Sequence, residues 1–189
     1  MRVSTDRHVI WTPWSAPGLE HLHLTIAPDA VVADSLVIAL HEGVPCRARY
    51  TVRCDGAWRV RAVEVALLDD SRPPLALWHD GAGRWSTPDG APLTALDGCL
   101  DIDIAVTPFT NTLPIRRLGL PLGASRDLTM AYVHVPELTV APDPQRYTRL
   151  ADRRYRYESR DSDFVAELPL DAEDLVLDYP GLFHRIWPR

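Results

Sequence analysis

A chain of 189 residues is long enough to bury one substantial hydrophobic core, and because no linker-like stretch divides it, we expect a single domain spanning residues 1–189. The formal net charge of -6 argues against a nucleic-acid partner, which a basic face would normally reveal. No segment approaches the roughly 18 apolar residues of a membrane span, and the amino-terminal stretch lacks the apolar run of a signal peptide. The 3 cysteines (Cys46, Cys54 and Cys99) show no CxxC spacing and fit reduced thiols, so we expect a cytoplasmic protein.

Alternation of apolar and polar residues with a period of two dominates the chain and predicts a mainly β protein. Turn signals such as Asp80-Gly81, Asp97-Gly98 and Pro142-Asp143-Pro144 separate the alternating segments. The pattern over residues 145–152 also fits a helix, and we favour a strand. In chain order, the expected strands are His8–Trp11, Leu19–Ile26, Leu36–His41, Cys46–Cys54, Trp58–Leu67, Leu75–His79, Leu100–Val106, Ile115–Leu122, Leu128–Val135, Leu138–Val140, Gln145–Asp152, Tyr155–Ser159, Phe164–Leu168 and Leu175–Tyr179.

The clearest hairpin is predicted between residues 46 and 67. Even-numbered residues from Cys46 to Cys54 are apolar or aromatic and the odd ones are arginine or threonine, so one face of this strand lies in a core and the other in water. Asp55-Gly56 supplies the turn, because these residues tolerate the positive φ that tight hairpins need. The phase of the alternation flips on the return strand, which indicates a β-bulge near Ala62.

Only the carboxyl-terminal segment is predicted to be helical. Pro180 suits the first position of a helix, and Leu182, Phe183, Ile186 and Trp187 recur with the spacing of one helix face. Because the segment is short, its apolar face must be buried to hold it helical.

The number of strands, about thirteen, constrains the architecture, because open twisted sheets rarely exceed about 10 strands without curling or splitting. We therefore expect a single many-stranded antiparallel sheet, curled as a spiral β-roll around the short carboxyl-terminal α-helix. A wide roll leaves an interior that must be filled by this helix, by an apolar ligand, or by both. A two-sheet sandwich is the alternative architecture.

Two histidines, His21 and His23, lie two residues apart, so on a strand they share a face and can supply two metal ligands. A third ligand would have to come from His8, His41 or Glu20, and Glu20 would point to the opposite face. We favour two solvated side chains on the outer face, and we expect neither a metal nor another cofactor.

Asp101 and Asp103 also share a face, and carboxylate pairs at about this spacing can cleave glycosides. The opposite face of the same strand is apolar. If that face fills the roll, both aspartates lie outside in water, which is the interpretation we favour. The sequence contains no GxSxG elbow and no glycine-rich phosphate loop.

The segment Pro108–Arg117, PFTNTLPIRR, combines two prolines, the only asparagine and a pair of arginines. Two interpretations remain open. The first is a rigid corner between two strands, because each proline removes a backbone donor and biases the preceding residue to extended geometry. The second is a polar rim that contacts a ligand headgroup, with Thr110 and Asn111 as hydrogen-bonding groups and Arg116 as a fork-shaped donor.

Eight stretches together resemble a bacterial family of glycolipid-binding proteins, formerly a domain of unknown function. They run from Pro17 to Arg185 in the order PGLEHLHL, ADSLVIAL, YTVRCDGAWRVRAVEV, DGAGRW, LDGCLDIDIAVTPFTNTLPIRRL, QRYTRL, YRYES and LVLDYPGLFHR. The resemblance implies a spiral β-roll wrapped around one helix, and a homodimer. It implies no catalytic residues, and its glycolipid assignment draws on structural likeness to periplasmic lipoprotein-carrier proteins.

We therefore predict a binding protein that holds a glycolipid or another amphiphile in, or at the mouth of, the apolar roll. Headgroup contacts are expected from Thr110, Asn111 and Arg116. Contacts inside the roll are expected from Tyr50, Trp58, Ile102, Ile104 and Tyr132. The first alternative is a non-catalytic dimeric interaction protein that acts through its dimer surface. The second is a hydrolase of carbohydrates or esters that uses the aspartate pair, or a metal at the histidine pair.

Overall fold

The structure is a computed structural model that describes residues 4–188, so residues 1–3 and 189 of the expected domain lie outside it. One group of strands comprises β1 (Thr5–Pro13), β2 (Leu19–Ile26), β3 (Ala30–His41), β4 (Val44–Asp55), β5 (Val60–Leu67), β6 (Leu75–His79), β7 (Trp85–Ser86), β13 (Asp178–Tyr179) and β14 (Phe183–Trp187). The other comprises β8 (Ile102–Ile104), β9 (Ser125–His134), β10 (Thr139–Ala151), β11 (Arg154–Ser159) and β12 (Val165–Pro169). The helical elements are α1 (Thr112–Leu118) and the 3-10 turns η1 (Thr94–Leu96) and η2 (Phe109–Asn111).

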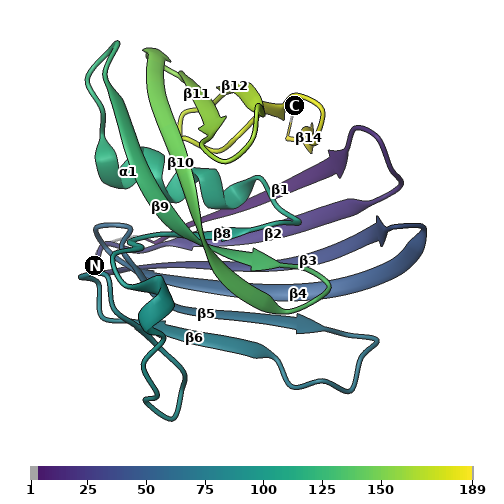
Figure 1. Cartoon of the computed structure of the whole chain (residues 1–189). Coiled ribbons are helices and arrows are strands. Elements are labelled where there is room, and N and C mark those ends of the chain that lie inside the picture. Colours follow the sequence, from purple (N-terminus) through teal and green to yellow (C-terminus); the bar gives the residue numbers. More distant parts are fainter. Residues whose placement is uncertain (1–3, 189) are drawn as a thin grey trace.

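The strands of the described chain form two sheets that face each other (Figure 1). The large sheet has 9 strands in the order β13-β14-β1-β2-β3-β4-β5-β6-β7, and the small sheet has 5 in the order β12-β11-β10-β9-β8. Only β8 and β9 pair in parallel. A mainly β fold with a large antiparallel sheet and one short α-helix is thus confirmed, although the strands divide between two sheets. The division falls in residues 87–101, where prolines and turns replace the alternating pattern.

The β4–β5 hairpin confirms the sequence-based prediction in detail. Tyr50 and Val52 of β4 are buried, and the arginines on either side of them, Arg49 and Arg53, are exposed. Across the pair, Arg53 opposes Ala62 and Cys54 opposes Val60, which leaves Arg61 as the extra residue of a bulge. The bulge lets both halves of β5 turn apolar side chains toward the core despite the flip in alternation.

Helix α1 lies between the sheets and joins two hydrophobic clusters (Figure 1). Phe109 and Leu113 belong to the cluster on the inner face of the large sheet. Ile115, two residues farther along, belongs to the cluster under the small sheet. This internal helix therefore occupies the position between the sheets that was assigned to the carboxyl-terminal tail.

The expected strand Ile115–Leu122 is wrong, because its first half is helical. Pro114 falls in the first turn of α1, where a missing N–H leaves no hydrogen bond unmade. The helix ends at Gly119, which adopts a left-handed φ of 50° and donates its N–H to the carbonyl oxygen of Ile115. The corner predicted around Asn111 is a 3-10 turn that continues directly into α1.

The expected carboxyl-terminal helix is also wrong, because residues 183–187 form strand β14. This strand pairs with β1, so that Trp11 opposes Arg185 and Pro13 opposes Phe183. Less than two turns of helix would be marginal alone, whereas the open edge of β1 offers the tail a full set of backbone partners.

Candidate functional site

Two adjoining half-open pockets form a cleft between the sheets. The apolar pocket has a volume of about 500 Å³. It is lined mainly by the start of β2, the last residues of β3, the end of β9 and residues 181–183. The polar pocket, with a volume of about 300 Å³, lies against β10, β11 and the segment after β8. Both are lined by Ala105, Tyr132, Leu182 and Phe183, which therefore form a shared wall. We call the two pockets together the cleft.

Apolar side chains dominate the first pocket. They come from the start of β2, from the last residues of β3, and from the turn before β14. Leu19 and Ile38 oppose each other on β2 and β3, and both remain about half exposed, at 38% and 49%. Exposed apolar side chains around a concavity are typical of a site that holds an apolar ligand.

Aromatic and carboxylate side chains together line the polar pocket. The rings of Tyr157, Phe164 and Tyr179 form a cluster with centroid separations of 5.8 to 6.0 Å. Asp103 and Asp143 provide carboxylates on the same lining. Aromatic faces and hydrogen-bonding carboxylates are the groups that contact the C–H and O–H surfaces of a sugar.

One amide holds the two aspartates of the polar pocket. The Gln145 Nε2 group donates to Oδ2 of Asp103 over 2.8 Å and to Oδ2 of Asp143 over 2.6 Å. Thr110 donates its hydroxyl to Oδ1 of Asp103 over 2.7 Å. Burial raises the pKa of both carboxyl groups, and neither forms a salt bridge within residues 4–188. Both are therefore kept in place by neutral donors.

Asp143 reaches the cleft because two prolines shape its strand. Pro142-Asp143-Pro144 was expected to be a turn, but it lies inside β10, which joins the expected strands at 138–140 and 145–152. The paired register of β11 with β10 begins at Gln145 and the Pro144 carbonyl oxygen accepts a backbone hydrogen bond from Arg160, so residues 139–143 have a free edge on that side among the described strands. An edge tolerates proline because no ladder hydrogen bond is lost there.

Glu20 is a buried carboxyl group on the lining of the apolar pocket, with 2% of its surface exposed. Its Oε1 accepts hydroxyl hydrogen bonds from Ser35 (2.8 Å), Tyr50 (2.6 Å) and Thr107 (2.8 Å). Its Oε2 is buried and has no hydrogen-bond partner. Burial raises the pKa of Glu20 to about 7. Since Thr107 lines the polar pocket, this carboxyl group links the two halves of the cleft.

Sequence reasoning named Glu20 only as a possible metal ligand on the face opposite the histidines and Asp143 only as part of a turn, and it did not single out Tyr157 or Tyr179. A signal for Glu20 was present, because it shares its strand face with Leu22 and Leu24, which are fully buried. A charged residue in phase with core residues is unusual and needs a partner.

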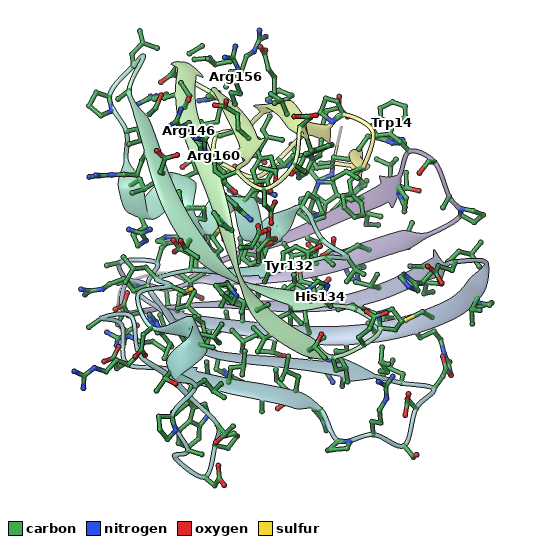
Figure 2. The ribbon with its side chains drawn as sticks, in the orientation of Figure 1. Trp14, Tyr132, His134, Arg146, Arg156 and Arg160 are labelled. Atoms are coloured by element: carbon green, nitrogen blue, oxygen red, sulfur yellow. The ribbon has the colours of Figure 1, made fainter. Side chains whose placement is uncertain are left out.

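Of the residues expected to contact a ligand, three line the polar pocket: Ile104, Asn111 and Tyr132. Asn111 accepts a hydrogen bond on Oδ1 from the Tyr147 hydroxyl at 2.8 Å. Tyr132 stands with His134 near the centre of Figure 2, where β9 crosses the large sheet.

The other expected contacts lie behind the pocket walls or away from them. Thr110 supports Asp103, Tyr50 supports Glu20, and Ile102 is fully buried in the core. The Arg116 guanidinium lies 4.3 Å from the centre of the Trp58 ring, and neither residue is part of either pocket lining.

The expectation that Asp101 and Asp103 lie in water is wrong. Asp101 has no exposed surface and forms a salt bridge with Arg117 at 2.6 Å. β8 is covered on both faces, since it lies between the large sheet and α1, so its polar face is buried as well as its apolar one (Figure 1). Of the two aspartates, Asp103 lines the cleft and Asp101 does not.

The histidine pair lies on the outer face of the large sheet. His8 Nδ1 and His21 Nε2 are 3.1 Å apart, and His23 Nε2 lies 3.1 Å from Oδ1 of Asp6. In the part of the chain that the structure describes, no group of three or more His, Cys, Asp or Glu side chains is arranged to hold a metal ion.

Comparison with known proteins supports the resemblance read from the sequence. A family model described as "Putative glycolipid-binding" matches residues 8–185. The crystal structure of a DUF1089 family protein from Pseudomonas aeruginosa is similar, with 41% identity, a TM-score of 0.82, and coverage of 92% of this chain and 95% of that one. No functionally curated protein matches the chain. No helix within residues 4–188 has the length and apolar character needed to cross a bilayer.

Proposed function

Because the chain belongs to the glycolipid-binding family whose model covers residues 8–185, we propose that it binds an amphiphile in the cleft between its two sheets. One observation carries the proposal: an apolar pocket and a polar pocket share a wall. The apolar chain of the ligand lies over Val37 and Leu182, and its polar headgroup lies against Tyr157 and Asp143. Asn111, Ile104 and Tyr132 contribute contacts on the polar side.

The dimensions of the cleft suit such a ligand. Pockets that hold small molecules usually enclose about 300 to 1,000 Å³ and combine an apolar lining with a few polar groups. The volumes of about 500 and 300 Å³ fall in this range. Burial of an alkyl chain stabilises the complex by about 0.8 kcal/mol for each methylene group removed from water.

Substitution of Ala105 tests the proposal, because this small residue belongs to the wall that both pockets share. We expect Ala105→Trp to obstruct the passage between the pockets and to abolish binding of n-decyl-β-D-maltoside measured by isothermal titration calorimetry. Ala91→Trp, at an exposed site outside the cleft, is the matched control and should bind as the unmodified protein does. Unchanged binding by a folded Ala105→Trp variant would contradict the proposal.

We also propose that the protein is a cytoplasmic homodimer. Exposed apolar side chains on the large sheet, such as Leu36 and Trp78 with 44% and 52% of their surface exposed, provide area for a second copy. The 3 free thiols at positions 46, 54 and 99 suit a reducing compartment. Light scattering coupled to size-exclusion chromatography measures the mass directly, and a monomer at micromolar concentration would contradict the dimer.

A further inference from the structure

The cleft has a one-sided charge. Five carboxyl groups line its two pockets: Glu20, Glu42, Asp103, Glu137 and Asp143. The chain contains 20 basic residues, all of them arginine, and within residues 4–188 no arginine lines either pocket. His41 and His134 are the lining groups that can become positive, and His41 already contacts Glu137 at 3.5 Å.

The arginines that are closest in sequence to the residues of the cleft have partners outside the cleft. Arg116 donates to the carbonyl oxygen of Glu173 at 2.8 Å and forms a salt bridge with Asp174 at 3.2 Å. Arg117 is fixed by Asp101. Arg146, Arg156 and Arg160 lie on the small sheet, well above Tyr132 and His134 in Figure 2, where they pair with surface carboxylates. These contacts leave the cleft without a cation of its own.

The lining carboxyl groups keep free capacity for hydrogen bonds. Asp143 accepts a side-chain hydrogen bond from Gln145 on Oδ2, and its Oδ1 has no partner among the described side chains. Glu20 Oε2 is buried and unpartnered, while three hydroxyl groups already occupy Oε1. Of these two oxygens, Asp143 Oδ1 belongs to the lining of the polar pocket, so a ligand hydroxyl group that donates a hydrogen bond to it gains affinity.

We propose that the headgroup taken by this cleft is an uncharged, hydroxyl-rich sugar whose hydroxyl groups donate hydrogen bonds to Asp143 and Asp103, and that amphiphiles with phosphate, sulfate or carboxylate headgroups are rejected. The inference rests on the proposed function and specifies the ligand class of the same site. An anionic headgroup would meet like charges with no arginine to neutralise them, which is unfavourable in a partly dry cleft.

A sugar hydroxyl is also compatible with either protonation state of these acids. Burial raises the pKa values of Glu20, Asp103 and Asp143. An ionised carboxylate accepts a hydrogen bond from a hydroxyl group, and a neutral carboxyl group donates one to it. The tyrosine rings of the polar pocket supply flat apolar surfaces for the C–H face of the sugar.

Two amphiphiles with the same chain test the inference: n-decyl-β-D-maltoside and n-decyl phosphate, titrated below their critical micelle concentrations at pH 7.5. We expect the maltoside to bind at least about tenfold more tightly, because like-charge contacts weaken the phosphate complex. Equal or tighter binding of the phosphate would overturn the charge selectivity and leave amphiphile binding intact. If neither compound binds, the proposed function fails and the inference fails with it.

The Asp143→Asn variant tests whether Asp143 is a source of the selectivity against anionic headgroups. Loss of this carboxylate should weaken maltoside binding about fivefold and strengthen phosphate binding, because one acceptor and one repelling charge are removed together. Asp152→Asn is the matched control, since the Asp152 side chain is 87% exposed and lies outside the cleft. An unchanged ratio of the two affinities in a folded Asp143→Asn variant would overturn the assignment. The comparison of the two amphiphiles on the unmodified protein requires no variant, so it decides the inference even if Asp143→Asn does not fold.

Discussion

Asp103 lies in the short strand β8 and Asp101 directly precedes this strand, yet the surroundings of the two carboxyl groups differ completely. Asp101 is fully buried and neutralised by the guanidinium of Arg117, with three hydrogen bonds between the two side chains. Asp103 receives its side-chain hydrogen bonds from Thr110 and Gln145, which carry no charge. The first carboxylate completes an ion pair that supports the fold, whereas the second lies at the edge of a cleft with no cationic partner among the described residues.

Glu20 belongs with Asp103 in this comparison. It too is held by uncharged donors and lines the cleft, and burial raises its pKa. The two kinds of carboxyl group therefore differ in their expected role. A carboxylate paired with an arginine supports the fold, whereas one without a charged partner has capacity to bind a ligand.

The largest effect is expected when the charge of Asp101 is removed. Asp101→Asn removes the partner of the Arg117 guanidinium. Because 17% of the Arg117 side-chain surface is exposed, most of this side chain would remain buried with an unpaired charge. We expect a loss of about 3 to 5 kcal/mol in the free energy of unfolding, measured by urea denaturation. The double variant Asp101→Asn, Arg117→Met should recover part of this loss, because it removes both charges. A loss below about 1 kcal/mol for the single variant would indicate that Asp101, like the carboxyl groups of the cleft, does not depend on a charged partner.

The second prediction concerns Glu20 and pH. Its pKa rises from an ordinary value of 4.5 to about 7 in the folded protein, so the folded state binds the proton more tightly than the unfolded state does. The resulting stabilisation is complete below pH 4.5 and is lost as the pH rises through 7. Between pH 4.5 and pH 8 we expect the unmodified protein to lose about 3 kcal/mol more stability than Glu20→Gln, which cannot ionise.

Urea unfolding of both proteins across this pH range measures the difference. Tyr50 is the titratable group that contacts Glu20 directly, and burial holds its pKa well above the ordinary value, so it does not ionise in this window. Parallel stability profiles for the two proteins would indicate that Glu20 stays ionised, as an already satisfied carboxylate would.

The smallest effect is expected from Thr110→Val, which keeps the shape of the side chain and removes the hydroxyl group that donates to Asp103. Loss of one hydrogen bond to a buried carboxyl group should lower the free energy of unfolding by about 1 to 3 kcal/mol. The pKa of Asp103 should rise further, since this hydrogen bond opposes the effect of burial. An NMR titration of the Asp103 carboxyl carbon in both proteins checks the shift, and an unchanged pKa would contradict the assignment of Thr110 as its support.

Much of the fold was predictable wherever one face of a strand is apolar and the other polar. The β2 and β6 segments begin and end at the residues that alternation indicates, and the β4–β5 hairpin has its bulge beside the predicted residue. The strand predicted at Ile115–Leu122 and the helix predicted at the carboxyl terminus failed for a common reason. The apolar residues of 112–118 and of 183–187 fit either periodicity over so few positions, and the neighbouring elements decide which one is adopted.

The cleft was less predictable than the strands. Asn111, Ile104 and Tyr132 were identified from the segments that carry them, but the partners of these residues come from β10, β11 and the turn before β14, which are distant in the chain. The Pro-Asp-Pro segment resembled a turn because both prolines lack an N–H group, and its position on a strand edge depends on where β11 stops pairing.

Alternation by itself determined the mainly β class, most strand positions and the bulged hairpin, because each of these depends on near neighbours in the sequence. The resemblance of the eight stretches indicated the family, which the family model over residues 8–185 shows. Tertiary structure alone decided which short segment became the helix, which of two equivalent aspartates met an arginine, and that Glu20 retained an unpartnered oxygen beside an apolar pocket. The physical reason is that the state of a buried charge depends on the groups brought to it by other strands, and no local pattern encodes that arrangement.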